Sequence, residues 1–137
     1  MYLIDTSVWI DFLKQRKTRA VAFLEDLLGN PLACGITDQV YLELLQGARD
    51  EESFNTLERY FSGQRFYNFE NSRRSHAAAA RIYFECRRAG IAVRSSIDCL
   101  IAQSACEHGL TLLHHDGDYA KMARVLPELK QKHFLPG

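Results

Sequence analysis

The chain has 137 residues, 47% of them hydrophobic and 11% aromatic, which is typical of a folded globular protein and not of a disordered one. Its 17 basic and 17 acidic side chains cancel, which argues against a protein that coats nucleic acid by net charge alone. We expect a single domain over residues 1–137. No apolar run reaches the length of a membrane span, and because an acid already stands at position 5 we expect no signal peptide. The four cysteines lack metal-ligand or disulfide-motif spacing, so we expect a cytoplasmic protein without membrane contact.

Short apolar runs alternate with amphipathic segments along the chain. In chain order they predict a strand at 2–4, helices through 8–13 and 18–28, a strand at 32–34, helices over 37–47 and 51–61, a strand at 65–69, helices over 72–89 and 95–108, a strand at 111–113 and a last helix after position 118. Strands that alternate with helices indicate an α/β fold with a largely parallel sheet covered on both faces.

Four acidic side chains stand out against this pattern. Asp5 and Asp116 follow apolar strands, and ligands of parallel sheets bind at those strand ends. Asp98 lies near the start of a helix, and Glu43 lies within one. Each acid also has a plainer interpretation. Asp5 is a typical helix cap, Asp98 could serve a capping box that begins at Ser95, Asp116 fits a turn, and Glu43 suits a solvated helix face.

A shared pocket for the four acids has a clear electrostatic consequence. Two carboxylates about 4 Å apart repel by ~4 kcal/mol at an effective dielectric constant near 20. Several such pairs would consume much of a domain's stability, so the pocket must hold protons or a cation. Oxygen ligands suit Mg²⁺ or Mn²⁺ better than Zn²⁺. Convergence of the acids therefore predicts metal-assisted hydrolysis, for example of a phosphodiester.

Four short segments carry a resemblance to a known nuclease family. They are Asp5-Thr6-Ser7, Glu43-Leu44-Leu45-Gln46-Gly47, the run from Arg94 to Ala102 and the run from His114 to Tyr119. In this order they resemble the motifs of PIN-domain nucleases, and the length and detail of the chain look most like the VapC toxins of bacterial VapBC toxin–antitoxin modules. Each motif alone is weak, whereas four in order across the whole chain are specific.

The resemblance implies a PIN-like three-layer α/β/α sandwich with a short, mostly parallel sheet. It also implies a Mg²⁺- or Mn²⁺-dependent endoribonuclease that is the toxin of a type II toxin–antitoxin system. The expected partners are an RNA substrate, a cognate VapB-type antitoxin and a second copy of the chain, with promoter DNA reached only through the antitoxin. By the same resemblance, the catalytic metal ligands are Asp5, Glu43, Asp98 and Asp116.

Accessory roles follow from the same resemblance. Thr6 would orient the Asp5 carboxylate through its hydroxyl, Ser7 belongs to the same motif, and Asp118 is an accessory acid. The chain departs from the family pattern at His114, where a hydroxyl residue is usual; an imidazole there could still hydrogen-bond Asp116.

A basic stretch is the expected substrate contact. Residues 73–94 contain six arginines and a single acid, Glu85. Arginine suits phosphate because its planar fork donates paired hydrogen bonds. We expect Arg94, Arg88 and Arg81 to bind substrate, Arg94 foremost because it lies near Asp98. The alternative for Arg81 and Arg88 is a solvated helix face on which they pair with Glu85.

Other functions share parts of this pattern. A haloacid-dehalogenase-type phosphatase also begins with a strand that ends in Asp, but it needs a second Asp two residues later, where this chain has Ser7. A PIN-like scaffold that binds RNA or protein without catalysis remains the alternative, although all four principal acids are present.

Overall fold

A four-stranded parallel sheet lies at the centre of the structure, a computed structural model that describes residues 1–136. Its strands are β1 (Tyr2–Ile4), β2 (Cys34–Gly35), β3 (Thr111–Leu113) and β4 (Lys130–Lys132), in the order β2-β1-β3-β4. Leu3, Ile4, Leu112 and Leu113 are fully buried, because helices pack on the central strands from both sides. The α/β class and the sheet predicted from the sequence are confirmed.

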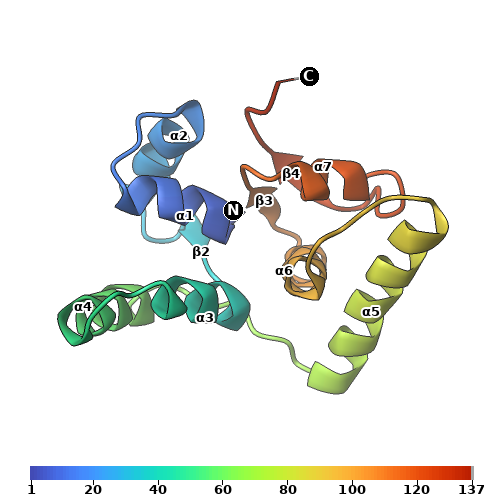
Figure 1. Cartoon of the computed structure of the whole chain (residues 1–137), viewed down its shortest axis with the longest axis horizontal. Helices are drawn as coiled ribbons and strands as arrows, with labels where there is room; N and C mark the ends of the chain where they lie inside the picture. Colours follow the sequence, from blue (N-terminus) through green and yellow to red (C-terminus); the bar gives the residue numbers. More distant parts are fainter. Residues whose placement is uncertain (137) are drawn as a thin grey trace.

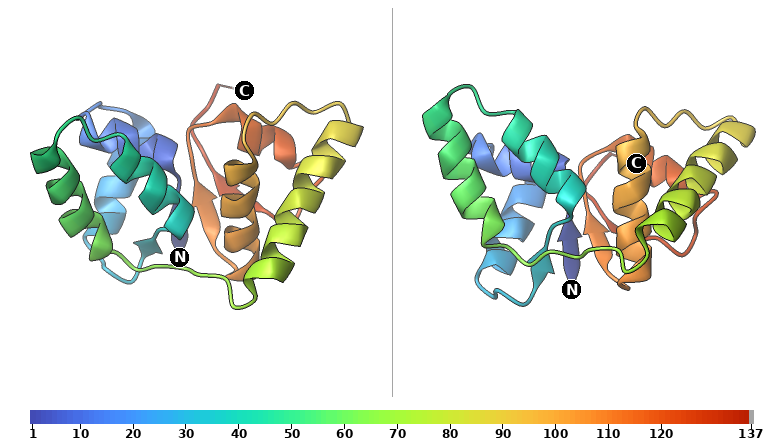
Figure 2. Two further views of the ribbon diagram at one scale, coloured as in Figure 1. Left: turned by 60° about the horizontal axis from the view of Figure 1, so that its bottom comes forward. Right: turned by 90° about the horizontal axis from the view of Figure 1, so that it is seen from below.

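Seven helices in the described part of the chain surround this sheet. They are α1 (Thr6–Leu13), α2 (Arg19–Leu28), α3 (Asp38–Gln46), α4 (Glu51–Ser62), α5 (Ser72–Arg88), α6 (Ser96–Glu107) and α7 (Gly117–Met122). Figure 1 shows α1–α4 gathered around β2 on one side of the molecule and α5–α7 gathered around β3 and β4 on the other. The views in Figure 2 show the same two halves, with α5 packed along α6.

Local capping fixes where most helices begin. The hydroxyls of Thr18 and Thr37 accept the backbone N–H of the residue three positions on, at 3.0 and 3.2 Å, which satisfies donors that a helix start leaves unpaired. Asp50 forms a full capping box with Ser53 at the start of α4. These starts agree with the predicted helices to within one or two residues.

Strand β2 covers Cys34–Gly35, so it begins two residues later and ends one residue later than predicted. A Cβ atom built on Gly35 would lie 2.4 Å from the carbonyl oxygen of Arg65 and 2.6 Å from the Tyr67 ring, so only glycine fits this close approach. The approaching segment was predicted as a strand over 65–69. That prediction is wrong: the segment makes one isolated bridge, between Ile36 and Phe66.

The strand order creates a switch point between β1 and β3. From β1 the chain moves to β2 on one side of the sheet, whereas from β3 it moves to β4 on the other side. Connections that leave neighbouring strands in opposite directions open a crevice at their carboxyl ends, and ligands bind there. Asp5 follows β1 and Asp116 follows β3 by three residues, so the topology sets both acids at this crevice.

Two further observations bear on the sequence predictions. The four cysteines are free, and none of the helices within residues 1–136 is long and apolar enough to cross a membrane. Strand β4 was not predicted from the sequence, because Lys130-Gln131-Lys132 is polar and lies at the edge of the sheet.

Candidate active site

Asp5 serves both as a helix cap and as a member of the acidic pocket. It is the N-cap of α1, and its Oδ2 accepts the backbone N–H of Ser7 at 3.0 Å and the Ser7 hydroxyl. Its Oδ1 accepts the hydroxyl of Tyr119 at 2.8 Å, and the side chain is almost fully buried. The capping interpretation is therefore correct without excluding a role in the pocket, because one carboxylate oxygen caps and the other faces Tyr119.

Glu43 reaches the same pocket from the middle of α3. The hydroxyl of Thr6, at the start of α1, donates to its Oε1 at 2.7 Å. Burial raises the pKa of Glu43, the Thr6 hydrogen bond opposes that rise, and the negative charges of Asp5 and Asp116 add to it. The expectation that Thr6 orients Asp5 is thus wrong. Ser7 holds Asp5 and Thr6 holds Glu43, because α3 packs against the first turn of α1.

Asp98 is the most perturbed acid of the pocket. It lies in the first turn of α6, where a capping box with Ser95 was the alternative prediction. Among residues 1–136, however, its carboxylate forms a hydrogen bond only with the Tyr119 hydroxyl, at 3.3 Å. Its pKa is raised to about 7, first by burial and then by the negative charges of Asp5, Asp116 and Glu43. The Tyr119 hydroxyl links Asp98 to Asp5, and carboxylate oxygens of Asp98 and Asp116 lie within 4.8 Å of each other, so these three acids lie around one pocket.

The Tyr119 hydroxyl bridges two of these acids with a single hydrogen. It lies 2.8 Å from Asp5 and 3.3 Å from Asp98, and Tyr119 is fully buried. Since one hydroxyl hydrogen serves one acceptor at a time, the shorter contact with Asp5 takes it. The contact with Asp98 is satisfied when Asp98 itself carries a proton, in agreement with its raised pKa.

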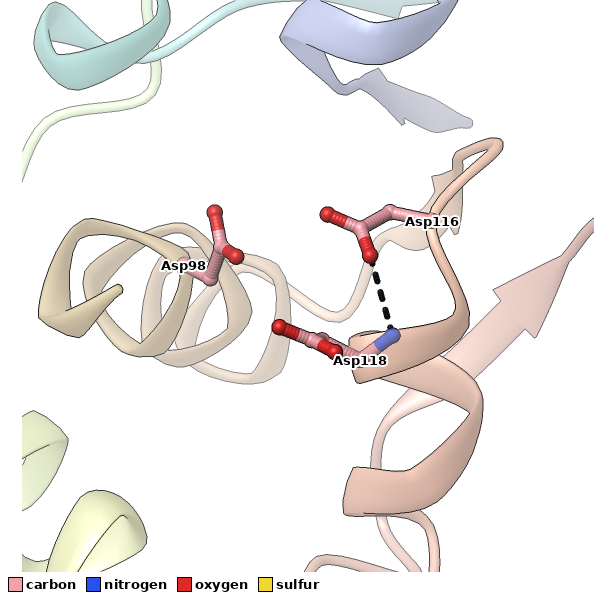
Figure 3. A group of neighbouring side chains, drawn as sticks. All are labelled: Asp98, Asp116 and Asp118. Atoms are coloured by element: carbon pink, nitrogen blue, oxygen red, sulfur yellow. Dashed lines mark hydrogen bonds between the residues drawn. The ribbon is translucent and has the colours of Figure 1, made fainter. Parts of the chain in front are cut away.

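Asp116 and Asp118 lie across the pocket from Asp98 (Figure 3), and Arg94 pairs with both of them. Oδ1 of Asp116 accepts the backbone N–H of Asp118 and Nη2 of Arg94, both at 3.0 Å. Oδ2 of Asp118 accepts the backbone N–H and Nε of Arg94, at 3.0 and 3.1 Å. Burial alone would raise the pKa of Asp118, but the hydrogen bonds and charge of Arg94 outweigh it and lower that pKa.

His114 supports the pocket from behind. Its Nδ1 accepts the backbone N–H of Asp116 at 3.1 Å, and its Nε2 lies 2.8 Å from Oε1 of Gln131. Burial lowers the pKa of His114, so the ring is neutral with its proton on Nε2. Gln131 in turn donates to the carbonyl of Tyr119 at 2.8 Å. The imidazole therefore takes the place of the usual hydroxyl by binding the main chain of Asp116.

The amino-acid sequence matches a known protein-family model. Residues 2–125 match the model described as PIN domain. The chain belongs to the PIN-domain family. Two curated relatives, the VapC ribonuclease Mb1587 of Mycobacterium bovis and ribonuclease VapC11 of Mycobacterium tuberculosis (strain H37Rv), are 37% identical to this PIN domain over 126 residues, which cover 91% of this chain and 93% of each relative.

Solved structures agree on the fold. A chain from the crystal structure of DNA-bound VapBC from Salmonella typhimurium superposes on this PIN domain with a TM-score of 0.75, covering 96% of both chains at 20% identity. A chain from FitAB bound to an IR36 DNA fragment gives a TM-score of 0.73, covering 100% of this chain and 99% of the other at 22% identity. At such identities the likeness concerns architecture alone.

The donor set of this PIN domain fits a hard divalent cation. One carboxylate oxygen each from Asp98, Asp116 and Asp118 lie within 4.8 Å of one another. Two of these acids, Asp98 and Asp116, are among the predicted ligands. Both oxygens of Asp118 already face cationic groups, Arg94 at 3.1 Å and Lys121 at 4.0 Å, so Asp118 is better suited to anchoring than to binding metal. Mg²⁺ and Mn²⁺ favour such oxygen ligands.

The predicted arginines separate into two groups. Arg94 lies at the pocket, in contact with the acids. Arg81 and Arg88 instead pair with Glu85, at 3.1 and 3.4 Å, and lie over the Phe84 ring on α5, as the solvated-face alternative describes. Their binding of substrate stays a prediction.

Tyr119 and Gln131 are the residues of the pocket to which the sequence assigned no role. The only sequence signal for Tyr119 was the aromatic position after two acids in the last motif. Gln131 carried no signal, because it lies on the unpredicted strand β4 and reaches His114 only through the pairing of β3 with β4.

Replacing Tyr119 by phenylalanine tests the bridging hydroxyl. The variant keeps the ring but leaves Oδ1 of Asp5 without its donor in a buried position, so we expect a loss of ~1–3 kcal/mol in the free energy of unfolding. Urea unfolding in metal-free buffer measures the loss. Tyr60→Phe is the matched control, because the Tyr60 side chain is 44% exposed. Equal stability of Tyr119→Phe and wild type would contradict the bridge.

Proposed function

We propose that this PIN domain is a metal-dependent endoribonuclease and the toxin of a type II toxin–antitoxin system, with Asp5, Glu43, Asp98 and Asp116 as the ligands of Mg²⁺ or Mn²⁺. One observation carries the proposal: acids from four separate segments lie around one pocket. The Tyr119 hydroxyl contacts both Asp5 and Asp98, oxygens of Asp98 and Asp116 lie within 4.8 Å of each other, and Glu43 is tied by Thr6 to the start of α1 beside Asp5. Such an arrangement is costly unless a cation compensates it. The names of the curated ribonucleases support RNA as the substrate.

The side chains around the four acids hold them in place for this chemistry. Ser7 and Tyr119 fix the two oxygens of Asp5, and Thr6 fixes Glu43. The neutral His114 holds the main chain of Asp116. When bound, a divalent ion would acidify a water molecule and stabilise negative charge on the scissile phosphate. The protein contributes a set of carboxylates whose positions are fixed before the substrate arrives.

The proposed partners rest on the surface near the pocket. A cleft between α1, α3 and α4 is lined by the apolar side chains of Ile10, Leu13 and Leu57, and Glu43 also lines it. Ile10 and Leu13 are 37% and 41% exposed, which suits a covering segment from a VapB-type antitoxin. A homodimer is proposed from the family resemblance, and DNA would be reached only through the antitoxin.

The decisive experiment compares cleavage by wild type and by Asp5→Asn. We expect purified wild type to cut total RNA in Mg²⁺ or Mn²⁺ and to stop in EDTA, and we expect Asp5→Asn to show no cleavage in either buffer. Asp26→Asn is the control, because Asp26 is an exposed acid on α2 outside the pocket. Cleavage by wild type that persists in EDTA would exclude the metal-dependent mechanism.

The alternative, a PIN-like scaffold without catalysis, has a distinct outcome. Such a protein would bind RNA in a filter-binding assay yet leave every RNA intact with Mg²⁺ or Mn²⁺ present. That result, from protein whose thermal unfolding is cooperative, would replace the nuclease proposal by the scaffold.

A further inference from the structure

Arg94 is the one Lys or Arg side chain within residues 1–136 that forms an ion pair with any of the four principal acids. Its Nη2 lies 3.0 Å from Oδ1 of Asp116. The side chain is nevertheless 75% exposed, so its outer face is free to meet solvent or another molecule. A positively charged group of the chain itself thus already holds a carboxylate that the proposed metal ion needs.

Asp118 determines where this guanidinium can reach. Its Oδ2 accepts both the backbone N–H and Nε of Arg94, and it is almost fully buried. The backbone contact fixes the segment just before α6, and the Nε contact fixes the near end of the guanidinium. Only the far end, Nη2, extends to Asp116. Asp118 therefore anchors the arginine at a fixed place beside the pocket.

Asp116 is the point of competition. Its Oδ1 already accepts the backbone N–H of Asp118, so the contact with Arg94 is a second donor on the same oxygen. A carboxylate that binds a divalent cation gives up electron density to that ion, and a guanidinium on the same carboxylate is then repelled by the ion's charge. The Arg94 contact and metal binding consequently oppose each other at Asp116.

We propose that Arg94 is a tethered counter-ion that competes with the divalent metal ion for Asp116, so that it keeps the pocket partly neutralised when metal is absent and lowers the affinity for metal. This inference rests on the proposed metal site. It assigns Arg94 a positioning role toward Asp116, in place of a simple contact with substrate phosphate. It also assigns Asp118 the task of holding Arg94, which explains an acid that is buried next to the pocket but turned toward cations.

Calorimetric titration of RNA-free protein with MnCl₂ tests the competition without reference to activity. We expect Arg94→Gln to bind Mn²⁺ about fivefold more tightly than wild type, which is the range for loss of one exposed ion pair. Arg88→Gln removes the same charge from α5, where Arg88 pairs with Glu85, and should bind like wild type. The pair of variants separates local competition from a change in net charge.

The outcomes distinguish the inference from the proposed function. Unchanged or weaker binding by Arg94→Gln, or equal tightening by both variants, overturns the role of Arg94 and leaves the metal site intact. If neither wild type nor Arg94→Gln binds Mn²⁺, the metal site itself is wrong and the inference falls with it. Binding by Arg94→Gln alone would support the competition most strongly.

A second measurement follows the contact itself. In wild-type protein, we expect saturation with diamagnetic Mg²⁺ to shift the Arg94 guanidinium resonances in a ¹H–¹⁵N spectrum, because Nη2 leaves Asp116. The resonances are assigned by their absence from Arg94→Gln. Guanidinium resonances that keep their positions at saturating Mg²⁺ would show that the ion pair survives metal binding, which contradicts the competition.

Discussion

Replacing Asp98 by asparagine should reduce RNA cleavage by at least ~100-fold while making the metal-free protein more stable. The loss follows because an uncharged amide is a poor ligand for Mg²⁺ in a pocket built from carboxylates. The gain follows because Asp98 is half-buried and its charge is repelled by Asp5, Asp116 and Glu43. Initial cleavage rates at saturating Mg²⁺ and thermal unfolding in EDTA measure the two effects.

A matched variant separates this explanation from helix capping. Asp98 and Asp38 both lie in the first turn of a helix, where a negative charge stabilises the helix by ~0.3–1 kcal/mol. Asp38 is exposed, so Asp38→Asn should lower the melting temperature slightly and leave cleavage unchanged. Above about pH 7, Asp98→Asn should raise the melting temperature of metal-free protein. If Asp98→Asn instead loses stability as Asp38→Asn does, its main role is in the helix start.

The sequence was sufficient to place the acids relative to the strands and helices, because these positions depend on local signals. Apolar runs placed Asp5 and Asp116 after strands, and parallel strands bring such positions to one edge. The sequence places Asp98 at a helix start, but it does not show which way the Asp98 side chain points. A capping box and a pocket use the same residue pattern, and only the packing of Tyr119 against Asp98 decides between them.

Other features depend on contacts between distant segments and left little trace in the sequence. Thr6 and Ser7 are adjacent hydroxyl residues, and which acid each one holds is set by the packing of α3 on α1. Strand β4 has a polar sequence and forms because it pairs with β3. The segment at 65–69 alternates like a strand, yet it crosses Gly35 too closely and too briefly to form a ladder.

The stability of metal-free protein should fall as the pH rises from about 5 to about 8, and Asp98 should cause much of the fall. Its pKa is about 7 in the folded protein against an ordinary value of 3.8, so the folded state holds this proton more tightly than the unfolded chain. Its stabilising contribution is complete below about pH 4 and is lost as the pH passes through about 7. Glu43, whose pKa is also raised, acts in the same direction.

His114 opposes this trend, so the test must be a difference between variants. Burial lowers the pKa of His114, and a lowered histidine pKa adds stability as the pH rises toward 6.5. Wild type and Asp98→Asn share this contribution, and it cancels when their free energies of unfolding, measured by urea unfolding in EDTA, are subtracted. We expect the difference to grow by ~1–2 kcal/mol between about pH 5 and pH 8, after allowing for the partial exposure of Asp98.

Saturating Mg²⁺ should remove the wild-type decline in stability, because the ion binds the ionised carboxylates of the folded state only. A difference that stays constant across this pH range would mean that Asp98 is ionised throughout, and the repulsion on which the proposed metal site depends would be absent.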